Sequence, residues 1–213
     1  MLVDRRHLLA VAAAGAVLAS PAGRLAALAQ SDPATSELMA EGPLKDLWVG
    51  KPDAPVTIIE YASMTCSHCA TFHAATWPTL KSKYIDTGKV RFALREFPLD
   101  PLALAAFMLA RCAGDDRREA VVELLFARQR EWLVEKPVAA LMGVVKEAGF
   151  TQESFESCLK NQQLYDAVSQ TRDRASQKFG INSTPTFFIN GKRQTGAITV
   201  DELDKLLAPF LKS

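Results

Sequence analysis

Hydrophobic positions along the chain form two kinds of pattern. Short runs of β-branched and aromatic residues occupy positions 56–61, 90–94 and 186–189, and such runs are typical of buried strands. Between the second and third runs, apolar residues recur at helical spacing for about eighty residues. The pattern predicts an α/β fold: a β-α-β unit, a helical block at about 100–179, and a β-β-α unit.

Local signals mark where these elements begin and end. Pro78 predicts a kink in the helix between the first two strands. Asp100, followed by proline, predicts the first helix of the block, and Thr199 opens a capping box before the last helix. Asn190-Gly191 predicts a tight hairpin turn. The first two strands should be parallel, because a helix connects them.

The first 29 residues differ from the rest of the chain. Arg5 and Arg6 precede an apolar run at 8–18, and residues 27–29 read Ala-Leu-Ala, which is the three-part plan of an export signal peptide. The run is too short for a membrane anchor. The paired arginines also resemble a twin-arginine signal, so the twin-arginine and general export routes both stay open. A buried N-terminal helix is the alternative.

The remainder reads as one globular unit. Residues 30–50 are polar and predict a flexible lead-in, and residues 51–213 form the predicted domain. Hydrophobic residues make up 48% of the chain, charged residues 23%, and the formal net charge is +1. These values are ordinary for a globular protein and give no support to nucleic acid or a membrane surface as a partner.

Cys66 and Cys69 enclose a Ser-His dipeptide between the first predicted strand and its helix. A cysteine at a helix N-terminus lies beside unpaired N–H groups and the positive end of the helix dipole, which stabilise a thiolate. His68 would add a hydrogen bond or a positive charge to the same sulfur. The motif predicts thiol–disulfide exchange, with Cys66 as the nucleophile and Cys69 as a less exposed resolving thiol.

Two other interpretations of this motif remain. In the first interpretation, Cys66 and Cys69 form a static disulfide, although so tight a loop at a helix start is strained and labile. In the second interpretation, Cys66, Cys69 and His73 bind a metal ion, but a structural zinc site needs four ligands. We expect no metal, place His73 at the surface, and expect no cofactor, because the chain has no glycine-rich phosphate-binding loop.

Two further candidates flank the motif. Glu60 lies at the end of the first strand, where a buried carboxylate would take the proton from Cys69; the alternative is a carboxylate that reaches solvent. Thr184-Pro185 immediately precedes the third strand. A cis bond there would place the Thr184 backbone beside Cys66, where a substrate peptide would pair with it as a strand does. A trans proline is the alternative.

These sequences together resemble the bacterial DsbA family of exported dithiol oxidases. The resemblance is carried by Glu60 and by residues 65–69, 95–100 and 183–191, and it is weakest inside the helical block. It implies a thioredoxin-like fold with a helical insertion. It also implies functional roles at the positions Glu60, Cys66, His68, Cys69 and Pro185.

The resemblance further implies a function. A DsbA-type protein oxidises reduced or unfolded exported proteins in the periplasm, and a membrane quinone-linked partner of the DsbB type reoxidises it. Ser67 stands where well-known members carry proline, which leaves the oxidising strength open. A monomer is expected. Two alternatives remain: a thiol–disulfide reductase or isomerase, and a chaperone-like peptide-binding module without redox turnover.

The other two cysteines, Cys112 and Cys158, both lie in the helical block. Each lies on an apolar helical stripe, so each is expected to point inward. Two buried free thiols are the plain alternative. An even cysteine count in an oxidising compartment favours a second, structural disulfide between them.

Overall fold

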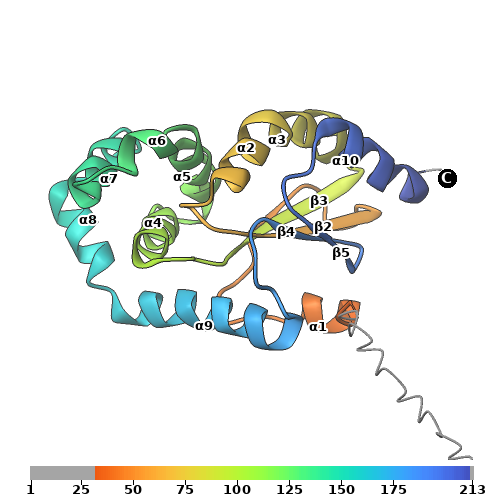
Figure 1. The fold of residues 1–213 in the computed structure, drawn as a ribbon, viewed down its shortest axis with the longest axis horizontal. Coiled ribbons are helices and arrows are strands. Elements are labelled where there is room, and N and C mark those ends of the chain that lie inside the picture. Colours follow the sequence, from red (N-terminus) through yellow and green to blue (C-terminus); the bar gives the residue numbers. More distant parts are fainter. Residues whose placement is uncertain (1–31, 212–213) are drawn as a thin grey trace, which may run out of the picture. The chain divides into compact units, whose positions relative to one another are not determined.

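The computed structural model describes residues 32–211, in which a five-stranded mixed sheet is surrounded by helices (Figure 1). The predicted export signal at residues 1–29 lies outside the described residues. The sheet order is β1-β3-β2-β4-β5. β2 and β3 are parallel, and β4 runs antiparallel to β2, which confirms the predicted β-α-β and β-β-α units. The strands in chain order are Trp48–Val49, Val56–Ala62, Val90–Glu96, Thr186–Ile189 and Lys192–Thr195.

The helical segment after β2 is divided into three parts. They are α2 (Ser67–Ala75), α3 (Trp77–Thr79) and the π-helical segment η1 (Leu80–Ile85). Pro78 lies in the first turn of α3 and has no N–H to donate to the preceding turn. The chain therefore breaks where the proline predicted a kink, and α2 remains a short helix directly behind the Cys-Ser-His-Cys sequence.

Alternate residues of β2 face opposite sides of the sheet. Ile59 and Tyr61 pack in one cluster with residues of α1 and α9 (Gln162–Phe179), whereas Ile58 packs with α2. Figure 1 shows this division, with α2, α3 and α10 (Val200–Leu207) on one face and α9 on the other. The alternation places Glu60 on the face that α2 covers.

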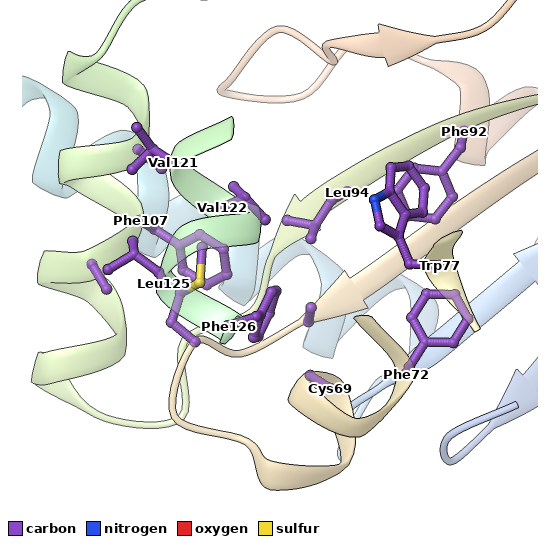
Figure 2. Close-up of a cluster of buried hydrophobic side chains, with 14 of the residues drawn as sticks. Cys69, Phe72, Trp77, Phe92, Leu94, Phe107, Val121, Val122, Leu125 and Phe126 are labelled. Atoms are coloured by element: carbon purple, nitrogen blue, oxygen red, sulfur yellow. The ribbon is translucent and has the colours of Figure 1, made fainter. Parts of the chain in front are cut away.

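Helices α4–α9 occupy the interval between β3 and β4, which confirms the predicted insertion. The insertion shares the core of the sheet, since Phe107, Leu125 and Phe126 belong to the same buried cluster as Phe72 and Phe92 (Figure 2). No helix within residues 32–211 is long and apolar enough to span a bilayer. The remaining bounds are α4 Pro101–Cys112, α5 Asp115–Ala127, α6 Gln129–Trp132, α7 Pro137–Lys146 and α8 Gln152–Leu159.

Several boundaries are set by the side chains that predicted them. Asp100 accepts a hydrogen bond from the Ala103 N–H at the start of α4, and Thr199 forms a capping box at the start of α10. Asn190 and Gly191 have φ values of 46° and 85°, as a type I′ turn requires. These interactions span at most a few residues, which is why the sequence alone predicted them.

The segment before the domain is more ordered than the expected flexible lead-in. It contains α1 (Thr35–Met39), and its strand β1 pairs antiparallel with β3. Leu38 of α1 is buried against the sheet. The sheet therefore begins within the segment that we had placed outside the domain.

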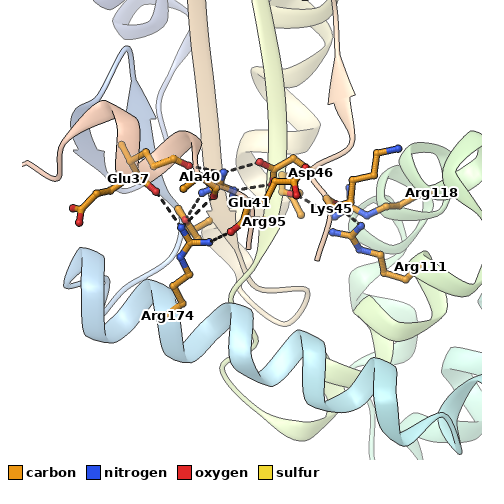
Figure 3. Close-up of polar contacts among 12 residues, drawn as sticks. Glu37, Ala40, Glu41, Lys45, Asp46, Arg95, Arg111, Arg118 and Arg174 are labelled. Atoms are coloured by element: carbon orange, nitrogen blue, oxygen red, sulfur yellow. Dashed lines mark hydrogen bonds and ion pairs between the residues drawn. The ribbon is translucent and has the colours of Figure 1, made fainter. Parts of the chain in front are cut away.

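Arginine side chains hold this segment in place (Figure 3). Arg95 makes two hydrogen bonds to the Asp46 carboxylate, of 2.8 and 2.6 Å, and a third to the Leu38 carbonyl. Arg174 of α9 donates to carbonyl groups of residues 37–41, and Arg111 donates to the Lys45 carbonyl. Bidentate guanidinium pairs of this kind are strong and directional. These hydrogen bonds could not be predicted from the polar composition of the segment, because most of the acceptors are backbone atoms.

Cys112, the last residue of α4, forms the predicted disulfide with Cys158 of α8. Their Cα atoms are 6.1 Å apart, a separation that ordinary disulfides show. Cys158 is buried, as expected. The expectation that Cys112 points inward is wrong: it is exposed, because α4 ends there at the surface.

Removing this bridge should lower the free energy of unfolding. In a Cys66→Ala/Cys69→Ala background, changing Cys112 and Cys158 to serine opens a loop with a sequence separation of 46. Chain entropy predicts a loss of about 4 kcal/mol, and less where the unfolded chain keeps structure. Urea unfolding of the two proteins measures the difference. The parent, unfolded without reductant, should show no free thiols, and two thiols would show that the bridge is absent.

Candidate active site

Cys66 is the residue at which strand-like backbone becomes helix. It is the N-cap of α2, with φ −79° and ψ 120°, and it is half-buried. A hydrogen bond from the Cys69 thiol and the backbone N–H groups of Cys69 and His68 lower the pKa of Cys66 to about 5, against the opposing effect of partial burial. Cys66 is therefore mostly thiolate at neutral pH and can act as a nucleophile.

Cys69 experiences the opposite environment one turn further along α2. Its side chain is fully buried, and both cysteines are free thiols in this structure. Burial raises the pKa of Cys69 first of all, and the hydrogen bond to Cys66 and the negative charge of Glu60 raise it further. The pair thus consists of a reactive outer sulfur and a protonated inner one, as predicted from the position of each in the helix.

The Thr184–Pro185 peptide bond is cis, and it lies beside Cys66 as predicted. The Cys66 thiol is 3.3 Å from the Thr184 carbonyl oxygen, to which it donates when protonated. The contact joins residues 118 positions apart, because β4 pairs with β2 and brings its own preceding loop to the start of α2. The backbone of Thr184 is therefore held next to the Cys66 sulfur.

His68 does not extend its ring to the sulfur in the way we expected. Its side chain is exposed at the start of α2, and its contribution to Cys66 comes from its backbone N–H. A cationic imidazole at this exposed position would still add a positive field that solvent screens.

Glu60 is buried, not solvent-facing. It lies two residues inside β2, and its Oε2 atom is 2.9 Å from Nε2 of His73. The placement of His73 at the surface is therefore wrong: the ring is buried between Glu60 and Phe126 of α5, on which it stacks at 4.3 Å between centroids. The sequence did contain a signal for the burial of His73. His73 lies four residues after Cys69, which puts the two side chains on one helical face.

Gln129 of α6 is a residue that sequence reasoning missed. It is buried, and its side-chain amide donates to the Met64 carbonyl at 2.8 Å and to the Cys66 carbonyl at 3.0 Å. Thr65, between these two residues, donates to the Asp100 carboxylate at 2.5 Å. The helical insertion therefore fixes the backbone that carries the nucleophile, and no sequence motif marks a glutamine for that role.

A metal ligand set is not assembled here. Among residues 32–211, no group of three or more His, Cys, Asp and Glu side chains is close enough together to hold a metal ion. His73, the third ligand that a metal site would have required, bonds to Glu60.

The fold and the paired cysteines define a protein of the thioredoxin class. A family model described as Thioredoxin matches residues 44–208, so the chain belongs to the thioredoxin family. It is 30% identical over 153 residues to disulfide bond formation protein D of Bacillus cereus, over 67% of this chain and 69% of that protein. Its fold matches that of Wolbachia pipientis alpha-DsbA1 with a TM-score of 0.75 and 29% identity, covering 83% of this chain and 96% of the other.

A further relative is a protein-disulfide oxidoreductase of Rickettsia bellii. It is 32% identical over 148 residues, which are 68% of this chain and 57% of that longer protein. The chain thus spans little more than half the length of this relative. Together these similarities confirm the resemblance to DsbA proteins that the motifs predicted.

The pKa difference predicts selective alkylation of the reduced protein. The rate of Cys66 modification by iodoacetamide should be half-maximal near pH 5, because only the thiolate reacts and its pKa is about 5. Cys69 should stay unlabelled at neutral pH. Peptide mass spectrometry after timed quenching measures both sites. Labelling of Cys69 before Cys66 would contradict the assignment.

The contacts of Gln129 predict a stability effect. Gln129→Leu leaves the buried Met64 carbonyl without its donor, so the free energy of unfolding should fall by about 1–3 kcal/mol. Arg130→Ala is the matched control, because Arg130 is the next residue of α6 and is exposed. Urea unfolding compares both variants with the parent protein, and equal midpoints for the two variants would refute the role of Gln129.

Proposed function

We propose that this chain is an exported thiol–disulfide oxidase that transfers its Cys66–Cys69 disulfide to other exported proteins. The observation that carries the proposal is the stabilised thiolate of Cys66. A pKa of about 5, against an ordinary value of 9.0, favours the reduced dithiol and so makes the disulfide form a strong electron acceptor. The names of the relatives, a disulfide bond formation protein and alpha-DsbA1, also support a function in disulfide formation.

The linkage between this pKa and stability has a definite sign. The folded-state pKa of Cys66 lies below that of the unfolded chain, so ionisation stabilises the reduced protein. This stabilisation is fully present above pH 9 and is lost as the pH falls through about 5. At the neutral pH of an exported compartment, much of it remains.

The reaction proceeds by two exchanges at one sulfur. A substrate thiolate attacks Cys66, the Cys66–Cys69 bond breaks, and Cys69 takes the electron pair and a proton, which Glu60 supplies. A second substrate thiolate then attacks the substrate sulfur of the mixed disulfide and releases Cys66 as a thiolate. The substrate has become oxidised and the dithiol reduced.

Substrate recognition is proposed for Thr184 and Pro185. The cis bond beside Cys66 leaves backbone groups that an extended substrate chain can pair with as an added strand. Backbone pairing does not read side chains, which suits reduced or unfolded exported proteins of many sequences. We further propose that the protein acts as a monomer in the periplasm and that a membrane quinone-linked partner of the DsbB type restores its disulfide.

Substitution of each cysteine tests the proposed roles. Cys66→Ala should abolish oxidation of a reduced, unfolded model protein, since no nucleophile or mixed disulfide remains. Cys69→Ala should accumulate mixed disulfides, because the thiol that resolves them is gone. Non-reducing gels of acid-quenched reactions detect the adducts. Adducts formed through Cys69 in the Cys66→Ala protein would overturn the assignment.

The reduction potential of the Cys66–Cys69 pair separates the oxidase from its alternatives. Equilibration with glutathione should give a reduction potential of about −120 mV, which is typical of strong oxidants. Thioredoxin has a reduction potential of about −270 mV. The Cys112→Ser/Cys158→Ser protein serves as a control that reports on the active-site pair alone. A value near that of thioredoxin would favour a reductase, and a pair that does not exchange would leave a peptide-binding module.

A further inference from the structure

The buried position of Cys69 creates a problem of proton supply. Each time the Cys66–Cys69 bond opens, Cys69 must gain a proton, and each time it closes the proton must leave. Cys69 has no exposed surface, so bulk water cannot exchange this proton directly. A route through other side chains is therefore required, and Glu60 by itself is equally buried.

Glu60 is joined to a second titratable group that the proposed reaction does not yet use. Its Oε2 atom is 2.9 Å from Nε2 of His73, and the two side chains are 0% and 4% exposed. The other polar atom of each, Glu60 Oε1 and His73 Nδ1, is buried without a hydrogen-bond partner among residues 32–211. Buried polar atoms in stable cores are usually paired, and leaving one unpaired is unfavourable. The buried Glu96–Arg118 ion pair also leaves one atom of each partner unpaired, so unpaired atoms alone do not mark a functional pair. What distinguishes Glu60–His73 is its place between Cys69, whose pKa Glu60 raises, and a pocket that His73 lines.

His73 also lines a pocket at the β1–β3 edge of the sheet, whereas Thr184 precedes β4. The pocket has a volume of about 90 Å³ and is bounded by β1, β3, α3 and α5, which is room for several water molecules. Its outer wall carries Asp115, Glu119 and Glu123, whose side chains are 66%, 35% and 41% exposed. The pocket therefore reaches from solvent to the buried imidazole.

Three elements supply the side chains around His73. Glu60 faces it from β2 and Cys69 lies one turn earlier on α2, while α5 contributes the stacked ring of Phe126. The remaining titratable groups that line the pocket are all on α5: Asp115, Arg118, Glu119 and Glu123. The carboxylates at the mouth are paired with lysines, Asp115 with Lys45 and both Glu119 and Glu123 with Lys81, so the rim carries partly exposed charges of both signs.

We propose that His73 relays protons between the solvent-accessible pocket and Glu60, so that Cys69 changes its protonation state while remaining buried. The proposal rests on the proposed thiol–disulfide exchange and assigns it a proton path. When the disulfide opens, protonated Glu60 gives its proton to Cys69. His73 returns a proton to Glu60 through Nε2, and its ring regains one from water in the pocket that its side chain lines. When the disulfide closes, each transfer runs in reverse.

The first test removes the relay and keeps the hydrogen bond. His73→Gln retains a donor for Glu60 but cannot change its charge. The rate at which glutathione reduces the oxidised protein, measured by acid quenching and thiol labelling, should fall at least tenfold, while alkylation of Cys66 in the reduced protein stays unchanged. Phe126→Leu is the matched packing control and should retain most of the rate. A His73→Gln rate equal to wild type would overturn the proposal.

Chemical rescue separates proton transfer from packing. In His73→Ala, added imidazole should restore the rate with saturation, and pyrazole, of the same size but a far weaker base, should not. Equal rescue by both compounds would show that the ring only fills space and would refute the relay. A wild-type protein that does not exchange with glutathione at all would instead refute the proposed function, so the two failures are distinguishable.

A variant outside the Glu60–His73 pair tests the path through the pocket even if the His73 variants do not fold. Val49→Phe narrows the pocket from β1, where Val49 is only partly buried, and leaves Glu60 and His73 intact. It should slow glutathione reduction and change its solvent deuterium isotope effect. An unchanged rate and isotope effect in a folded Val49→Phe protein would contradict a path through this pocket.

Discussion

The arrangement of this site depends on the way strand β2 runs into helix α2. Cys66 is the last extended residue before the helix, so its sulfur meets backbone N–H groups that have no partner inside the helix. Cys69, one turn later, lies in the core. Two chemically identical thiols therefore have pKa values that move in opposite directions. Their difference in reactivity comes from environment alone, and everything that holds the junction in place also maintains that difference.

Two distant parts of the chain hold it. The cis Thr184–Pro185 bond reaches Cys66 because β4 pairs with β2, and Gln129 reaches the Cys66 carbonyl because the helical insertion packs against the same core. The insertion is thus part of the active-site scaffold and not an appended module. Close packing gives such a scaffold little freedom to move, and the disulfide between α4 and α8 restricts the insertion further.

The buried Glu60–His73 pair is a costly feature of this core. Transfer of two ionisable groups out of water is unfavourable, and well-packed apolar residues in their place would often be at least as stable. The pair lies between a thiol that must exchange a proton and a pocket that reaches solvent. The proposed proton relay would give this pair a role that stability alone does not provide.

The sequence by itself determined the order of strands and helices, the capping residues Asp100 and Thr199, the hairpin at Asn190-Gly191 and the identity of the two reactive cysteines. Each of these depends on interactions within a few residues or on a pattern that repeats along one element. Only the tertiary structure decided that residues 35–49 belong to the fold, that His73 is buried beside Glu60, and that Gln129 supports Cys66. Those contacts join residues 13 to 137 positions apart, and many of them bind backbone carbonyls. The free energy of such a contact depends on partners that no local pattern identifies.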